Sequence, residues 1–215
     1  NLLKKKGYEI PLASRISKGT HLNNLLNLTE GETVSSTITL KSLDVDGSFI
    51  MVTNNGLIKR SEIREYNTSL RKRGLKAISL TEGDILNFVM NTDGNKDVML
   101  VTSMGMAVRY NETLVRCIGK NGQGSRSMLL SKDDSIAAML AIDAEADPSI
   151  LVITESGKGK KTSASEYRST AGRSVKGQRT INHHKRETTG KIVSALALND
   201  NDDILVLTNK GKMMR

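Results

Sequence analysis

The sequence predicts an all-β domain: a propeller-like array of about four four-stranded blades, with incomplete blades at both ends. Three observations predict it. A unit of about 50 residues repeats along the chain, its apolar runs are short and rich in Val and Ile, and no stretch keeps the apolar period of a long helix. Four-stranded units at this spacing are typical of propellers, whose blades bury their faces against one another. A β-solenoid is the alternative, although its repeats are usually shorter.

Each repeat opens with a short apolar run that is followed by Thr, two variable residues and Gly. The four copies end at Gly56, Gly105, Gly157 and Gly211, which lie 49, 52 and 54 residues apart. The apolar runs are too short for helices, so we expect buried strands. We expect each Gly to supply the positive φ of a tight hairpin turn, most plainly at Asn55-Gly56.

A second strand is expected to leave each turn. The fourth position after the glycine is basic in every copy, namely Arg60, Arg109, Lys161 and Arg215. Neighbouring residues of a strand point to opposite faces, so the sequence leaves open whether this position or the one before it faces outward. The best helix candidate is at residues 61–66, and it is one turn at most.

The rest of the unit is predicted from a second set of recurring signals. A loop with basic residues around a second glycine comes first, with the glycine at positions 19, 74, 124 and 177. Short strands are expected next, at residues 77–80 and 127–130. A turn at residues 29–32, 81–84 and 132–134 then precedes the last strand, which is expected at residues 33–40, 85–90, 135–142 and 192–198.

We expect a single repeat domain over residues 1–215, because no linker interrupts the pattern. Its approximate units are residues 1–46, 47–95, 96–147 and 148–202, and a further unit starts at 203–215. The first unit lacks its opening strand and the last stops one strand in. The chain also begins without Met, so we expect it to be part of a longer protein.

The charge balance predicts a polyanionic partner. Lys and Arg number 32 against 23 Asp and Glu, for a net charge of +9, and such a surplus usually meets nucleic acid or an acidic membrane face. Aromatic residues make up only 3%, which argues against binding by base stacking. The single cysteine, Cys117, excludes an internal disulfide and favours a cytoplasmic location. No apolar run is long enough to span a membrane.

No motif for catalysis or metal binding stands out. His183 and His184 are adjacent, so in a strand they would point to opposite faces and make a poor pair of ligands. Residues 157–162 lack the Gly that precedes Lys-Ser/Thr in a phosphate loop, and residues 119–124 do not match the dinucleotide fingerprint. No Gly-x-Ser-x-Gly elbow is present. We expect a non-catalytic domain with no cofactor and no metal.

Basic residues that recur at one position of every blade would form a track along the edge of the particle. Lysines and arginines on a curved edge can follow the phosphates of duplex DNA, without reading its sequence. The expected DNA-binding residues are Arg15, Lys18, Lys59, Arg60, Arg71, Lys72, Arg73, Arg109, Arg116, Lys120, Arg126, Lys160, Lys161, Arg173, Lys176, Arg179 and Arg215. The alternative is that these residues only keep exposed strands from pairing edge to edge.

Several segments resemble the C-terminal domain of the bacterial DNA gyrase A subunit, namely residues 15–32, 55–60, 116–124 and 157–167. The resemblance runs over nearly the whole chain in the family's order. It implies a β-pinwheel, in which strands are exchanged between blades, and a role in wrapping DNA for negative supercoiling. It also implies two partners, which are the rest of the gyrase A subunit, and the gyrase B subunit. The isolated chain is expected to be monomeric.

The resemblance places catalysis elsewhere. The tyrosine nucleophile and the ATPase site belong to other parts of gyrase, so we assign no catalytic role to Tyr8, Tyr66, Tyr110 or Tyr167. Gyrase A tails carry the box Gln-Arg-Arg-Gly-Gly-Lys-Gly, which has no copy here; residues 70–76 and 173–179 are nearest. Either the box lies in an absent blade, or the chain is the related topoisomerase IV A subunit, whose tail steers substrate choice. A propeller that binds a protein on a flat face is a further hypothesis.

Overall fold

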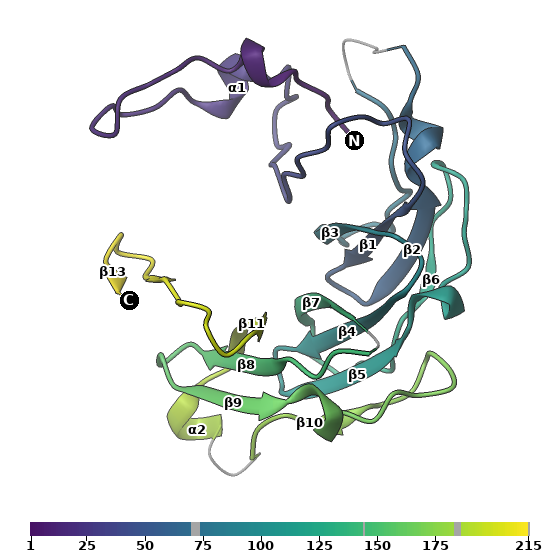
Figure 1. The fold of residues 1–215 in the computed structure, drawn as a ribbon, viewed down its shortest axis with the longest axis vertical. Coiled ribbons are helices and arrows are strands. Elements are labelled where there is room, and N and C mark those ends of the chain that lie inside the picture. The colour runs from purple at the N-terminus through teal and green to yellow at the C-terminus, as the bar shows by residue number, and fades with distance from the viewer. Residues whose placement is uncertain (70–73, 144, 183–185, 215) are drawn as a thin grey trace.

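The computed structural model describes residues 1–69, 74–143, 145–182 and 186–214. Its antiparallel sheets follow one another around an open, C-shaped arc, and the N-terminal segment around α1 (Leu22–Leu25) and the C-terminal end lie on either side of the gap (Figure 1). Helical elements in the described chain have at most four residues, and none is long enough or apolar enough to cross a membrane. The expected all-β repeat fold is confirmed.

The strands form three large sheets and one small one. From the inner to the outer side of the arc, the first contains β3 (Leu86–Thr92), β1 (Ser48–Thr53), β2 (Leu57–Glu62) and β6 (Ser125–Arg126). The second contains β7 (Ile136–Asp143), β4 (Lys96–Thr102), β5 (Met106–Asn111) and β10 (Gln178–Arg179). The third contains β11 (Ile192–Leu198), β8 (Ser149–Thr154) and β9 (Gly159–Ser163), and the last pairs β12 (Val206–Leu207) with β13 (Met213–Met214).

Short helical turns precede or connect these strands. They are η1 (Gly7–Glu9), α1 (Leu22–Leu25), η2 (Ile63–Tyr66), η3 (Glu112–Leu114), η4 (Ala164–Glu166) and α2 (Arg186–Thr189). The turn η2 confirms the single helical turn expected at residues 61–66. Its counterparts η3 and η4 follow the second strand of the next two hairpins, so this turn is part of the repeat.

Each outermost strand comes from the unit that follows its sheet. β6 lies after β5 in the chain yet pairs with β2, with Ile58 opposite Ser125, and β10 pairs with β5, with Ala107 opposite Gln178. The same exchange occurs at the start of the chain. There, Leu2 and Leu75 donate backbone hydrogen bonds to each other's carbonyl oxygens, at 2.7 and 2.9 Å. This pattern is the strand exchange that the β-pinwheel resemblance implies.

The second recurring glycine allows this exchange. Gly74, Gly124 and Gly177 have φ of +73°, +97° and +82°, in the left-handed region that favours glycine. A Cβ atom at each would also run into a carbonyl oxygen of the partner strand, at Leu2, Ile58 and Ala107 respectively. The exchanged segment therefore crosses its partner strand too closely for any side chain.

The Thr-x-x-Gly motif closes each hairpin with two kinds of hydrogen bond. In all four copies the glycine amide donates to the threonine carbonyl, over 2.8–3.1 Å, at Gly56, Gly105, Gly157 and Gly211. In three copies the threonine hydroxyl accepts from the amide after the glycine, at Leu57, Met106 and Lys212. Each glycine has positive φ, as expected for a three-residue hairpin loop.

The apolar runs lack alternation because both faces of each sheet are buried. On β1, Phe49 and Met51 pack with Tyr66 and the N-terminal segment, whereas the intervening Ile50 and Val52 pack against the second sheet. On β4 the same division repeats: residues 98 and 100 face the first sheet, and residues 99 and 101 face the third. The core is thus a series of sheet-to-sheet contacts around the arc.

Four expected details are wrong. Residues 77–80 and 127–130 are not strands. Before the second of these segments, the outer segment that pairs is β6, which begins directly after Gly124 and ends after two residues. Residues 33–40 form no strand either. In the other units this segment pairs with the first strand of its own hairpin, which the first unit lacks. The last unit has two short strands, β12 and β13, rather than one.

Candidate nucleic-acid interface

The strand order determines which basic residues can reach the outer side of the arc. The inner strands β3, β7 and β11 lie toward the open centre, and the exchanged strands β6 and β10 lie on the outside (Figure 1). Residues on or beside the exchanged segments are therefore candidates for contact with a large polyanion, whereas residues between two sheets are not.

Lys59 does not face the outer side, contrary to expectation. Its side chain is fully buried, and Nζ donates to the carbonyl oxygens of Ala77 and Lys120 at 2.6 and 2.8 Å. Burial lowers the pKa of Lys59 from 10.5 to about 8, while the nearby Glu65 opposes this shift. Lys59 joins two loops and has no surface for a phosphate.

Arg60 and Arg109, at the fourth position after the turn glycine, also face a junction between blades. Arg60 is half-buried, and its Nε donates to the carbonyl oxygen of Val115 at 3.0 Å. Arg109 is 8% exposed; its Nε donates to Asp97 and its Nη1 to the carbonyl of Ala164, both at 2.9 Å. The next blade buries Arg109 and partly covers Arg60, so neither is as open as a DNA track would need; the DNA contact expected of Arg60 stays a prediction.

The third copy of this position differs. Lys160 and Lys161 are exposed on β9, which has no exchanged strand beside it in the described chain. Lys160 Nζ donates to the carbonyl oxygen of Thr180 at 3.0 Å, and Lys161 Nζ lies 3.6 Å from Asp200. Both remain available at the surface.

The exchanged segments carry an exposed basic residue at one repeated position. It is the second residue after the second recurring glycine: Lys76, Arg126 on β6 and Arg179 on β10. None of the three forms an ion pair with a described residue, so their charge is not compensated locally. Lys76 is absent from the residues predicted from the sequence, although its distance from Gly74 could have identified it.

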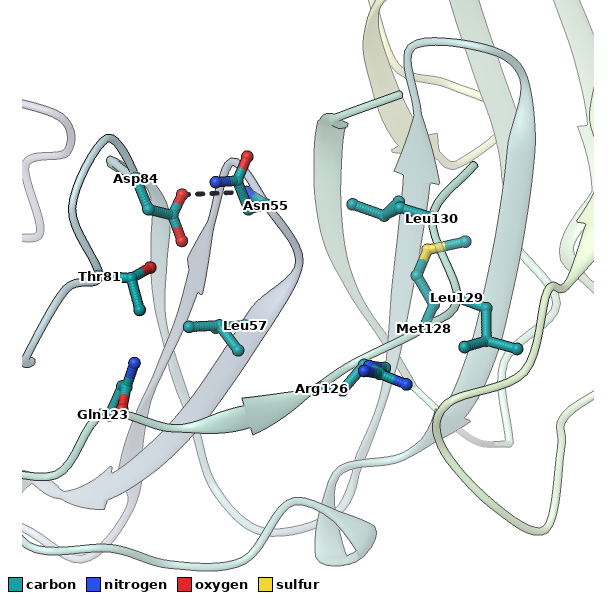
Figure 2. A pocket seen from close by; sticks show the side chains of 9 residues that line it. All are labelled: Asn55, Leu57, Thr81, Asp84, Gln123, Arg126, Met128, Leu129 and Leu130. Carbon is teal, nitrogen blue, oxygen red and sulfur yellow. Dashed lines mark hydrogen bonds between the residues drawn. The ribbon is translucent and has the colours of Figure 1, made fainter. Parts of the chain in front are cut away.

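A groove lies beside Arg126. It has a volume of about 490 Å³, and Figure 2 shows Arg126 and Leu129 on one side and Asn55 and Asp84 on the other. Asp84 Oδ1 accepts from the Asn55 amide at 3.0 Å and so holds the turn at residues 81–84 against the hairpin. The next blade has an equivalent groove of about 210 Å³, lined by Arg179, Lys176 and Lys132 among others.

The other predicted residues fall into three groups. Arg15, Lys18, Arg116 and Lys176 are exposed. Lys120 and Arg173 are half-buried: the Lys120 amide donates to Glu65 at 2.9 Å, and Arg173 Nη1 donates to the Ser125 hydroxyl beside Arg126. Arg71, Lys72, Arg73 and Arg215, like His183 and His184, lie outside the described residues.

Some other charged groups of the described chain form ion pairs. Arg64 contacts Asp44 and Asp46, at 3.3 and 3.0 Å, and Lys96 contacts Asp143 at 2.9 Å. Over the described ranges, no group of three or more His, Cys, Asp or Glu side chains could hold a metal ion. The recurrence of an exposed basic residue, without an ion pair among the described residues, at one position of each exchanged segment is the feature to explain.

Comparison with known proteins identifies the family. A family model described as "DNA gyrase C-terminal domain, beta-propeller" matches residues 6–41, 47–93, 96–143 and 148–199, most of the chain. The chain belongs to this family. The DNA gyrase A subunit of Haloquadratum walsbyi is 35% identical over 214 residues, which cover 98% of this chain and 24% of that protein. The Staphylococcus epidermidis gyrase A protein is 34% identical over 213 residues, covering 99% and 23%. The chain thus spans about a quarter of the length of these relatives.

Solved structures agree with this assignment of the fold. The C-terminal domain of a DNA topoisomerase IV superposes with a TM-score of 0.80 at 27% identity, over 91% of this chain and 60% of that one. A gyrase A C-terminal domain superposes with a TM-score of 0.77 at 24% identity, over 92% and 64%. The chain described here shares the architecture of both.

Proposed function

We propose that this domain binds duplex DNA along its outer edge and bends it, as a non-catalytic part of a gyrase-type topoisomerase. One observation carries the proposal. Lys76, Arg126 and Arg179 are exposed, form no ion pair with a described residue, and hold the same position of the exchanged segment in consecutive blades. A single surface lysine is a solvated charge, but a basic residue that recurs along an arc can form a track.

The chemistry of this track favours duplex DNA over other polyanions. Phosphates follow one another about every 1.7 Å along the duplex axis, so a row of cations can engage several of them in succession. Bending 20–30 bp costs on the order of 1–6 kcal/mol, which several phosphate contacts can offset. The four Tyr and two Phe supply few platforms for single-stranded bases. We also propose that the domain acts in the cytoplasm. Its protein partners there would be the remainder of the gyrase A subunit and the gyrase B subunit.

A second candidate is the tail of a topoisomerase IV A subunit. It is favoured by the superposition on a topoisomerase IV C-terminal domain and by the absence of the seven-residue box from this chain. Gyrase remains the first candidate because the family model describes a gyrase domain and both relatives compared above are gyrase A subunits.

The test is to incubate a nicked plasmid with the 215-residue chain, seal the nick with ligase, remove the protein and measure the linking-number distribution. A shift of one sign that grows with protein concentration supports wrapping with a defined hand. Salt-sensitive binding without a shift favours the topoisomerase IV candidate. The absence of both binding and shift would refute the DNA proposal and leave a protein-binding propeller.

A further inference from the structure

We propose that Arg60 and Arg109 are positioning residues, which fix the angle between consecutive blades and thereby the curvature of the basic outer edge. In this proposal they contact no DNA. The inference rests on the proposed function, because curvature matters only if DNA follows the edge. It would give a role to the basic residue four positions after the turn glycine in the two blades that carry Arg60 and Arg109.

The contacts of Arg60 join two blades by both backbone and side chain. Its carbonyl oxygen accepts from the amide of Ile118 at 2.8 Å, and it forms a parallel bridge with Cys117. Its Nε donates to the carbonyl of Val115, at the end of η3. A single residue of β2 therefore holds the segment that leaves the next blade's hairpin.

Arg109 repeats this arrangement at the following junction. Its carbonyl oxygen accepts from the amide of Thr170 at 2.8 Å, and it forms a parallel bridge with Ser169. Its Nη1 donates to the carbonyl of Ala164, in η4 of the next blade. In both junctions the guanidinium thus bonds to the short helical turn of the following blade. Lys161, at the equivalent position of β9, instead approaches Asp200.

The location of these bonds makes them suited to control an angle. Val115 and Ala164 are fully buried, so few alternative partners are available for their carbonyl groups. The exchanged strands β6 and β10 pair with the same strands, β2 and β5, that carry Arg60 and Arg109. A change at the guanidinium would therefore tilt the segment that ends in the exposed Arg126 or Arg179.

Two substitutions of Arg60 separate positioning from DNA contact. In Arg60→Gln, the amide nitrogen stands at the place of Nε, so the donor is kept and the charge is lost. In Arg60→Lys, a carbon stands there, so the charge is kept and the donor is lost from that place. Arg126→Gln and Arg126→Lys are the matched pair on the exposed edge. Arg109 is less suitable, because its loss would leave Asp97 buried without its partner.

The readouts are the linking-number change per bound chain at saturation and the salt dependence of binding. The salt dependence is expressed as the salt slope, which is the magnitude of the slope of log K against log salt. The proposal predicts that Arg60→Lys lowers the linking-number change by roughly half or more with the salt slope unchanged, and that Arg60→Gln resembles the wild type. Arg126→Gln should lower the salt slope by about 0.9, and Arg126→Lys should not. Loss of wrapping in Arg60→Gln but not in Arg60→Lys would overturn the proposal in favour of direct contact. A wild-type linking-number change in both Arg60 variants would also overturn it.

A second measurement keeps this inference separate from the proposed function. Spin labels on cysteines placed at Glu82 and Lys132, exposed turns of consecutive blades, report the distance between the blades in a Cys117→Ser background. Arg60→Lys should shift or broaden the distance distribution, whereas Arg60→Gln should not. An unchanged distribution in Arg60→Lys would overturn the positioning role even if the wild type wraps DNA. A failure of the wild type to wrap DNA would instead refute the proposed function.

Discussion

Lys59 and Lys160 stand at the same position of the repeat, three residues after the turn glycine, but differ in their surroundings. Each donates to a carbonyl oxygen three residues after a second recurring glycine, at Ala77 and Thr180. Lys59 also bonds to the carbonyl of Lys120, which belongs to the next unit and helps to bury it. The same residue type is thus structural at a complete junction and exposed where the junction is incomplete.

The lowered pKa of Lys59 predicts a pH dependence of stability. Between about pH 8 and 10.5 the unfolded chain keeps a proton that the folded chain has released, so the free energy of unfolding rises with pH. The apolar variant Lys59→Met lacks this contribution. Urea unfolding across this window should therefore show wild-type stability rising relative to the variant, by up to about 3 kcal/mol. Parallel curves would mean that the two carbonyl contacts keep Lys59 protonated.

Two buried tyrosines predict opposite effects of removing a hydroxyl. Tyr110 is fully buried, and its hydroxyl has no hydrogen-bond partner among the described residues. The Tyr66 hydroxyl, in contrast, donates to the carbonyl of Ala77 at 3.3 Å. Tyr110→Phe should leave the free energy of unfolding unchanged or raise it by up to about 1 kcal/mol, whereas Tyr66→Phe should lower it by about 0.5–1.5 kcal/mol. Equal losses in denaturant unfolding would contradict this difference.

At the scale of the strand, the two sets of recurring glycines serve different purposes. The turn glycine Gly157 has positive φ but open space around the position of a Cβ. The crossing glycine Gly177 has positive φ, and a Cβ there would also run into the carbonyl oxygen of Ala107. The sequence predicts that both recur, but only the strand exchange explains why the second is needed.

This difference predicts the relative cost of two alanine substitutions. Gly157→Ala should lower the free energy of unfolding by about 1–2 kcal/mol, because alanine is strained at positive φ. Gly177→Ala should cost about 1–3 kcal/mol more, because β10 must move away from β5. Chemical denaturation of the two variants provides the comparison. A Gly177→Ala variant no less stable than Gly157→Ala would show that β10 is not held against β5.

The hairpins of this fold were predictable from local signals, whereas the exchanged strands were not. Thr-x-x-Gly specifies a turn through contacts within four residues, so the positions of β1, β2, β4 and β5 follow from the sequence. The outer strands are only two residues long and pair with a different unit. Propensity placed a strand at residues 127–130 instead, because three of those four residues are apolar. Two of them, Met128 and Leu130, pack in the core between blades.

For the whole molecule, the sequence predicts a polyanion track but does not show which of its basic residues face outward. Charge alone cannot separate Arg109, which binds Asp97 and Ala164 between blades, from Arg126, which is exposed on the outermost strand. The alternation of faces along a strand does not identify the outward-facing residue either. In the first hairpin, the side chains of both neighbours, Lys59 and Arg60, form hydrogen bonds with other segments of the protein. Only the strand order identifies the outer side of the arc.

The central claim is that the exchanged segments form the DNA-binding edge. The most direct test compares Lys76→Gln/Arg126→Gln/Arg179→Gln with a control of equal charge, Lys41→Gln/Lys191→Gln/Lys210→Gln, whose residues are exposed elsewhere. The measurement is the salt dependence of binding to duplex DNA. We predict that the edge variant reduces the magnitude of the slope of log K against log salt by up to about 3. The control should leave this magnitude nearly unchanged. Equal reductions in both variants would contradict a defined edge, and no reduction in the edge variant would place the contacts elsewhere.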